Sequence, residues 1–536
     1  MNKIYLTTSI LIVAVFTVAY LYFSSITAGS RNNDKALSLI PHDAALIFTF
    51  KNDKDVYEIF NGYTVFDAIA GTQKKEEISA LRSILLNSDR GLQRLGGQTI
   101  FLSFHPQETD SVAFLWIMPL PQKSDETNIV NTFKNNKSIT FKEKTDSKLR
   151  ILEAHIQSLK RPFYVYFDNN VVLGSFSRKV VENSLNSKGA KISADFTDEI
   201  NQASNQSQNA PASVFVNYRS SIPFLSKFFK NKLGGNFLLL NNFDAISILN
   251  LNFKSDALMF NGITKPDTSK NNFLNLFLKQ QPVKNPIKRI VPSNTAYFIA
   301  YGVSNYSSFH QDLIQLLKKR KEIETNDKNL SLIRDETGIN VDRDIKKYWG
   351  NEFITFQLST QEKFAAIKLT NGRQMQFFME PLSSEYSPGI RHLNYPGLPY
   401  YYFGDGFKQF NKPFYTIVDN LMLISNSPGS LNRYLHRYSR SLLYENDRYL
   451  IFDQLVADQS NISVFIHTQN SRSNIKSHLK SAYAKAFTGD DYGLKEFYGF
   501  SYQLNSGNNQ FFTNFYAGYA KKLEDSSLSA TTDSLN

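Results

Sequence analysis

The chain has 536 residues, of which 42% are hydrophobic and 14% aromatic, with a formal net charge of +12 and no cysteine. At about 100 to 200 residues per domain, this length predicts more than one folded unit, and the apolar fraction excludes wholesale disorder. The absence of cysteine excludes disulfide frameworks, thiolate metal sites, iron–sulfur clusters and cysteine nucleophiles.

The positive charge is typical of chains that bind nucleic acid, anionic lipid or acidic glycan. Arg is the minority among the cations, whereas strong phosphate recognition usually relies on the planar Arg fork. The codon usage of an A/T-rich genome also explains the abundance of Lys, Asn, Phe, Tyr and Ile. We therefore expect no nucleic acid partner.

Residues 1–30 are predicted to form a signal anchor. No residue between Lys3 and Arg31 is charged, and a helix over residues 4–26 is roughly 34 Å long, enough to cross a bilayer. A cleaved signal peptide is the alternative, because residues 28–30 offer small side chains for cleavage. Since a long following domain is translocated largely regardless of its charge, we expect a single-pass protein of the inner (cytoplasmic) membrane, with the bulk of the chain periplasmic.

The rest of the chain contains an internal repeat, in which sequence blocks recur in the same order about 250 residues apart. The matching pairs of blocks are 40–48 and 291–299, 95–101 and 348–354, 161–169 and 412–420, 213–216 and 463–466, and 251–252 and 504–505. We predict two homologous domains over residues 37–266 and 288–520, a linker over 267–287, and a disordered tail over 521–536.

Each copy follows the same predicted series of elements. In the first copy these are a strand over 44–50, a helical stretch over 54–86, strands over 99–104 and 111–118, a hairpin around 168–169, a helix from 177, a strand over 213–218, a helix over 222–229, and a closing hairpin over 246–263. Hairpins interspersed with helices predict an α+β fold of antiparallel sheets with helices on one face.

Motifs of known chemistry are missing from the sequence. It holds no phosphate loop, dinucleotide turn, serine nucleophile elbow or zinc-protease motif. The eight His residues do not recur at matching positions of the two copies, and Gly404-Asp405-Gly406 is predicted to be an ordinary loop. We expect no catalytic residue, no metal site and no cofactor, since the copies share the residues that build a fold.

Three arginines form the candidate binding site. Arg433, Arg437 and Arg440 follow helical spacing after Ser430 and alternate with aromatic residues. On one helix face they would bind phosphate or carboxylate groups. The alternative interpretation is a solvated helix whose arginines pair with nearby carboxylates.

The Pro-x-[Asp/Asn]-x-Ala pattern at 41–45 and 292–296, with the blocks around Gly97 and Gly350, resembles a family of uncharacterised membrane-anchored envelope proteins of Bacteroidota. The resemblance implies a periplasmic α+β ectodomain and no particular activity. We expect a non-enzymatic periplasmic scaffold or binding protein that assists envelope transport, folding or assembly and contacts another envelope protein. The alternatives are a binder of anionic lipid or glycolipid, and a hydrolase with an unrecognised site.

Overall fold

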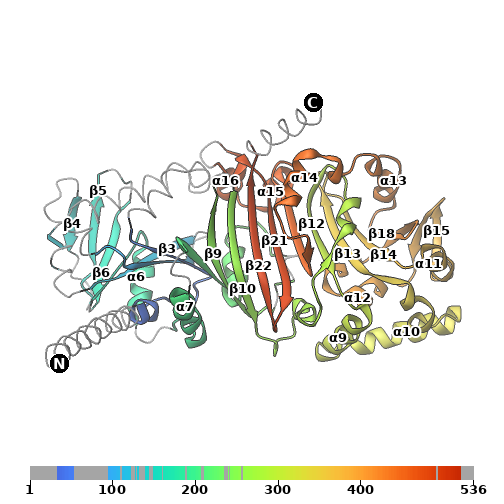
Figure 1. Cartoon of the computed structure of the whole chain (residues 1–536), viewed down its shortest axis with the longest axis horizontal. Coiled ribbons are helices and arrows are strands. Elements are labelled where there is room, and N and C mark those ends of the chain that lie inside the picture. Colours follow the sequence, from blue (N-terminus) through green and yellow to red (C-terminus); the bar gives the residue numbers. More distant parts are fainter. Residues whose placement is uncertain are drawn as a thin grey trace, which may run out of the picture. The chain divides into compact units, whose positions relative to one another are not determined.

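The structure is a computed structural model of the chain (Figure 1). It describes residues 33–53 and 95–520, apart from short gaps at 109–111, 122–126, 128–129, 132–138, 144–148, 158, 160, 169, 187–189, 207–209, 234–238, 241, 255–256 and 490–492. Within these residues the chain forms two compact units, of which unit 1 ends at Phe215 and unit 2 begins at Val216.

Unit 1 is an antiparallel sheet with the strand order β8-β1-β2-β3-β7-β6-β5-β4. Its strands are β1 (Leu46–Lys51), β2 (Thr99–Pro106), β3 (Val112–Pro119), β4 (Ile139–Glu143), β5 (Leu152–Ile156), β6 (Phe163–Asp168), β7 (Val171–Ser175) and β8 (Ala212–Asn217), and its helices are α6 (Arg178–Leu185) and α7 (Ala194–Gln206). Helix α6 is amphipathic, and the apolar face that carries Val180 and Val181 is buried against the core.

Unit 2 contains a larger antiparallel sheet with the order β9-β10-β22-β21-β20-β12-β13-β14-β18-β17-β16-β15. Its strands are β9 (Ala245–Lys254), β10 (Ala257–Pro266), β12 (Thr295–Gly302), β13 (Trp349–Leu358), β14 (Lys363–Leu369), β15 (Ser383–Ser387), β16 (Ile390–Leu393), β17 (Phe414–Val418), β18 (Leu421–Ser425), β20 (Ile462–His467), β21 (Phe497–Gly507) and β22 (Gln510–Tyr519). A separate short ladder joins β11 (Val283–Lys284) to β19 (Gln459–Ser460). The order from β20 to β15 repeats, strand for strand, the order in unit 1.

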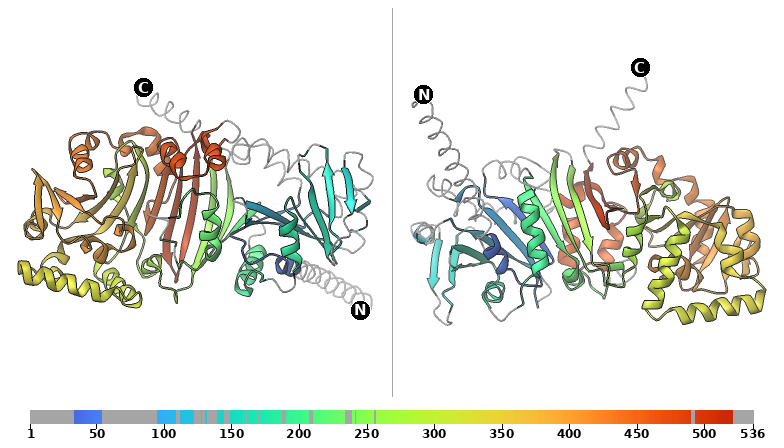
Figure 2. Two further views of the ribbon diagram at one scale, coloured as in Figure 1. Left: turned by 180° about the vertical axis from the view of Figure 1, so that it is seen from behind. Right: turned by 60° about the horizontal axis from the view of Figure 1, so that its bottom comes forward.

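The helices of unit 2 surround this sheet (Figures 1 and 2). They are α8 (Ser221–Ser226), α9 (Tyr306–Lys319), α10 (Ile323–Thr337), α11 (Gly372–Met379), α12 (Leu398–Phe403), α13 (Pro428–His436), α14 (Asp447–Gln454), α15 (Arg472–His478) and α16 (Ser481–Thr488). Helix α10 lies at the margin of unit 2 in all three views.

Helices cover both faces of the central strands of unit 2, which corrects the prediction of helices on one face. On β12, Ile299 and Tyr301 point into a core formed with α9, α11 and α12. The alternate residues Phe298 and Ala300 point into a second core formed with α13 and α14. Because the strand is apolar at successive positions, both of its faces must be covered.

The predicted separation into two domain sheets also needs correction. Strand β10, in the closing hairpin of the predicted first copy, pairs with β22 of the predicted second copy from Ala257 to Thr264. That hairpin therefore belongs to the sheet of unit 2. Within the predicted linker, residues 273–279 form the 3₁₀ helix η3 (Phe273–Lys279), whose Phe273 and Phe277 are fully buried in the first core.

The N-terminal transmembrane helix of the predicted fold finds no support in the structure. Across the part of the chain that the structure describes, no helix is long and apolar enough to span a membrane. The predicted anchor over residues 1–30, the whole predicted helical stretch over 54–86, and the predicted tail over 521–536 lie outside the described residues.

Candidate binding groove

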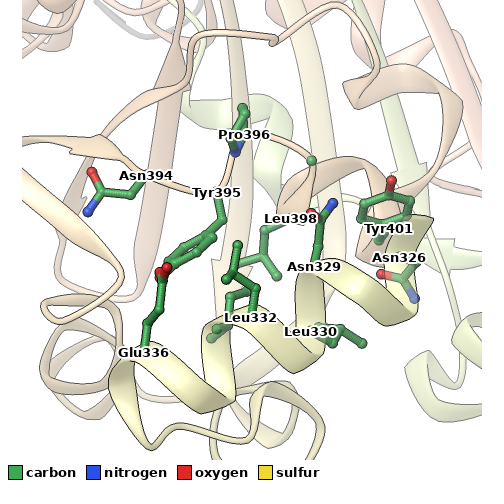
Figure 3. Close-up of a pocket in the computed structure, with 12 residues that line it drawn as sticks. Asn326, Asn329, Leu330, Leu332, Glu336, Asn394, Tyr395, Pro396, Leu398 and Tyr401 are labelled. Carbon is green, nitrogen blue, oxygen red and sulfur yellow. The ribbon is translucent and has the colours of Figure 1, made fainter. Parts of the chain in front are cut away.

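An open groove of about 340 Å³ lies in unit 2 between helix α10 and the segment 394–401 (Figure 3). We call it the α10 groove. One wall is the face of α10 from Asn326 to Glu336, and the other is the loop before α12 together with its first turn. Ligand sites of small size are usually concave and combine apolar walls with a few polar groups, and the α10 groove has both features.

Helix α10 packs loosely, because only Asn326 and Ile333 of its side chains are buried. It ends where Gly338 adopts a left-handed conformation, with φ of +70°, and donates its N–H to the carbonyl of Arg334. Leu332 is 46% exposed and lines the groove. An exposed Leu beside a concave surface is a group that a partner can cover.

The opposite wall is shaped by a close contact between Gly397 and Tyr401. A Cβ atom on Gly397 would lie 2.7 Å from the Tyr401 ring, so a larger residue would push the ring out of place. Pro399 occupies the first turn of α12, where its fixed φ suits a helix start. The side chains of Leu398 and Tyr401 are both nearly buried and form the apolar floor.

A buried ion pair holds this wall to the corner between α9 and α10. The Arg320 guanidinium donates to both carboxylate oxygens of Asp405, at 2.6 and 3.0 Å. Beside it, the Tyr400 hydroxyl donates to Glu322, which also accepts from Lys408 at 3.2 Å. Asp405 belongs to the predicted Gly-Asp-Gly loop, which is a 3₁₀ turn, η7 (Asp405–Phe407), at this corner.

The polar groups of the groove are mostly neutral. At one end the Tyr395 hydroxyl donates to Glu336 at 2.5 Å, and burial together with this hydrogen bond raises the pKa of Tyr395 to about 12. At the other end Asn326 is 2% exposed, and its Oδ1 has no hydrogen-bond partner within the described structure. A buried polar atom without a partner is costly, so this oxygen is a ready acceptor for a bound molecule or water.

The three predicted anion-binding arginines do not share one helix face. Helix α13 ends at His436, and Arg437 leaves the helical conformation with φ of −127°. Arg440 lies in the following 3₁₀ turn and is exposed. Arg433 donates to Glu362 at 2.7 Å, and Tyr438 donates to the same carboxylate. Arg433 is therefore paired with a carboxylate of the same chain, as in the alternative interpretation of these arginines.

A polar relay in unit 1 escaped the sequence analysis. Ser103 and His105 lie on the same face of β2, with Ser103 Oγ 2.8 Å from His105 Nε2, and His105 Nδ1 lies 2.7 Å from Asp43. This is the order of groups in a serine hydrolase triad. Ser103 is fully buried, however. A nucleophile must reach its substrate, so we assign the relay a structural role.

The matching register of unit 2 has no such relay. Ile47 pairs with Ser103 in unit 1, and Phe298 pairs with Phe356 at the corresponding place in unit 2. Leu358 corresponds to His105 in the same register. The side chains of Phe356 and Leu358 are both buried. The repeated strand arrangement therefore forms in unit 2 without a polar relay at this position, so the fold itself does not require the relay of unit 1.

Two other histidines, one buried and one half-buried, serve packing. His310 stacks on Tyr402 with ring centroids 4.7 Å apart, and burial lowers the pKa of His310 to about 4. Burial likewise lowers the pKa of His467 to about 4. Both are therefore neutral at pH 7. Among the residues that the structure describes, no three His, Asp or Glu side chains are placed to hold a metal ion.

Comparison with known proteins gives one family. A family model described as a protein of unknown function (DUF3352) matches residues 5–367. This range includes the described residues of unit 1, α10 and the strands up to β13, and it ends within β14, so it does not reach the 394–401 wall of the groove. No curated protein and no solved structure gives a significant match.

Proposed function

We propose that this chain, which belongs to the DUF3352 family, is a non-enzymatic scaffold or binding protein of the cell envelope, and that its α10 groove binds an extended segment of a partner protein. The observation that carries the proposal is the unpartnered Oδ1 of buried Asn326 in an open groove beside exposed Leu332. The groove thus offers a hydrogen-bonding group, Asn326, and an apolar group, Leu332, on the same helix.

An extended peptide suits these groups better than an anionic headgroup does. Asn326 and Asn329 each carry an amide donor and acceptor, which complement the N–H and C=O of a peptide chain. Asn394 adds an amide donor, since its Oδ1 already accepts from the Ser384 hydroxyl at 2.9 Å. Apolar side chains of the partner can cover exposed Leu332. The lining contains one carboxylate, Glu336, and no Lys or Arg, so it lacks the cations that phosphate recognition requires.

Site-specific photocrosslinking in cells tests the groove. A photoreactive phenylalanine analogue at Leu332 is expected to capture a discrete envelope protein, whereas the same group at exposed Ser331, the preceding position on α10, is expected to capture much less of it. Equal capture at both positions, or recovery of glycan or lipid alone from position 332, would contradict a peptide-binding groove.

A charge substitution gives the matching affinity test. Leu332→Glu is expected to weaken co-purification of the captured partner about tenfold or more, because it places a carboxylate against the partner's apolar surface. Leu332 is already half exposed, so the fold should be retained. Arg437→Glu with Arg440→Glu serves as the control. If the double arginine variant lost the partner and Leu332→Glu retained it, the anionic-ligand alternative would replace the proposal of a peptide-binding groove.

The location that we propose is the periplasm, at the inner membrane. The support is the uncharged apolar sequence between Lys3 and Arg31 and the resemblance to envelope proteins of Bacteroidota. In spheroplasts, externally added protease is expected to degrade units 1 and 2 while a cytoplasmic marker stays intact. Protection of both units until the cells are lysed would place the chain in the cytoplasm.

A further inference from the structure

Helix α11 presents an aromatic and a basic residue on its outer face. Asn371 begins the helix by accepting from the N–H of Gln374 at 3.0 Å, and Met375 and Met379 point into the core. Phe377 is 67% exposed, more than any other large apolar side chain in the described residues. Arg373 lies one turn before Phe377 and is also exposed, so the two side chains share a face.

The neighbouring 3₁₀ helix η6 (Lys346–Tyr348) extends this surface. The rings of Tyr348 and Phe378 stack with centroids 5.8 Å apart, and Phe378 meets Phe377 edge to face at 5.3 Å. Lys347 Nζ lies 5.2 Å from the Tyr348 ring and 5.9 Å from the Phe378 ring. We call the set Lys346, Lys347, Tyr348, Arg373, Phe377 and Phe378 the α11 patch.

The residues of the α11 patch carry three positive charges and no negative charge. Carboxylates near the patch are Asp342 and Asp344 in the π-helical turn η5 (Val341–Ile345), where Lys347 also acts electrostatically on Asp344, and Glu380 at the end of α11, which lies 3.7 Å from Arg391. Asp342 accepts from the Tyr402 hydroxyl at 2.8 Å, and Asp344 pairs with Arg343 at 2.7 Å. Helix α11 contains no acidic residue, and within the described residues no ion pair engages the three cations of the patch.

We propose that the α11 patch binds the surface of an anionic phospholipid membrane. Aromatic side chains favour the boundary between headgroups and acyl chains, and Lys and Arg near it are attracted to anionic lipids. Phe377 inserts at that boundary, while Lys346, Lys347 and Arg373 contact headgroup phosphates. None of these residues lines the α10 groove, so the inference goes beyond the proposed function and is independent of it.

A fluorescent reporter at position 377 tests membrane insertion. Full-length Phe377→Trp is added to phosphatidylglycerol vesicles whose acyl chains carry bromine, a short-range quencher of Trp emission. We expect quenching and a blue shift beyond those of the wild-type chain, which supplies the background from its two native Trp residues. In zwitterionic phosphatidylcholine vesicles of the same kind we expect neither change. Quenching of equal size in both vesicles, or in neither, would overturn the proposal.

Matched variants exclude binding through other parts of the chain. Tyr386→Trp places the reporter on β15, where Tyr386 is 62% exposed, and is expected to be quenched no more than the wild-type chain. In the Phe377→Trp background, changing Lys346, Lys347 and Arg373 to Gln is expected to lower affinity for phosphatidylglycerol vesicles on the order of tenfold to a hundredfold. Quenching of both reporters alike, or unchanged affinity without the three cations, would contradict binding through the α11 patch.

Discussion

Replacement of Asp405 with Ala is expected to lower the free energy of unfolding of unit 2 by about 3 kcal/mol. Asp405 is 11% exposed and Arg320 is 18% exposed, and their side chains are joined by two hydrogen bonds. The substitution leaves the guanidinium buried without its carboxylate, and an unpaired buried charge is among the costliest defects in a protein. Since the pair holds α12 beside α10, we also expect weaker capture of a partner from position 332.

The two Trp residues allow this effect to be measured in the intact chain. Trp116 lies on β3 of unit 1 and Trp349 on β13 of unit 2, so a Trp116→Phe background leaves one reporter, in unit 2. Urea unfolding followed by Trp349 emission gives the change in stability.

A double variant separates the loss of charge pairing from the loss of packing. Arg320→Leu with Asp405→Leu should recover much of the stability, because no charge then remains buried. If Asp405→Ala cost less than about 1 kcal/mol, or if the double variant were less stable than the single one, the pair would act as an ordinary surface ion pair.

Local elements follow closely from the sequence. The predicted hairpin around 168–169 is the β6–β7 hairpin, and the predicted closing hairpin is β9–β10. Both are short-range pairings whose turn residues and alternating apolar positions lie within about 20 residues of each other. The antiparallel α+β character follows for the same reason.

Long-range pairing does not follow from such patterns. Nothing in the sequence of β10 distinguishes β22 from any other strand of alternating residues, although the two pair over eight positions. Whether a sheet is covered on one face or two also depends on where distant helices pack. The continuous apolar run in β12, which is buried at nearly every position, was the available signal for two covered faces.

The candidate site was predictable only in part. Arg433, Arg437 and Arg440 fit a helical repeat, but the repeat cannot show that α13 stops at His436. The α10 groove depends on Leu332, which falls outside the apolar stripe of a mostly polar helix, and on a loop some 60 residues later. A lone exposed Leu is common on protein surfaces, so its position beside a concave wall becomes meaningful only in three dimensions.

Replacement of His105 with Ala is expected to lower the free energy of unfolding of unit 1 by about 2 kcal/mol at pH 7. His105 is 1% exposed, so its removal leaves a cavity and deprives the buried Ser103 hydroxyl of a partner. A Trp349→Phe background leaves Trp116 as the reporter of unit 1 during urea unfolding. Ser103→Ala is the control and should cost less, since it removes only the hydroxyl.

The relay also predicts how this loss depends on pH. Burial acts to raise the pKa of Asp43, but the hydrogen bond and electrostatic attraction of His105, together with His42 and a backbone hydrogen bond, outweigh burial, and the pKa lies below its usual value of 3.8. The folded chain therefore resists protonation of Asp43 more than the unfolded chain does. The stabilisation is complete above about pH 4 and is lost as the pH falls through the folded pKa. The difference in the free energy of unfolding between wild type and His105→Ala should thus shrink from pH 7 to pH 3. A difference that stayed constant over this range would show that His105 does not stabilise the Asp43 carboxylate.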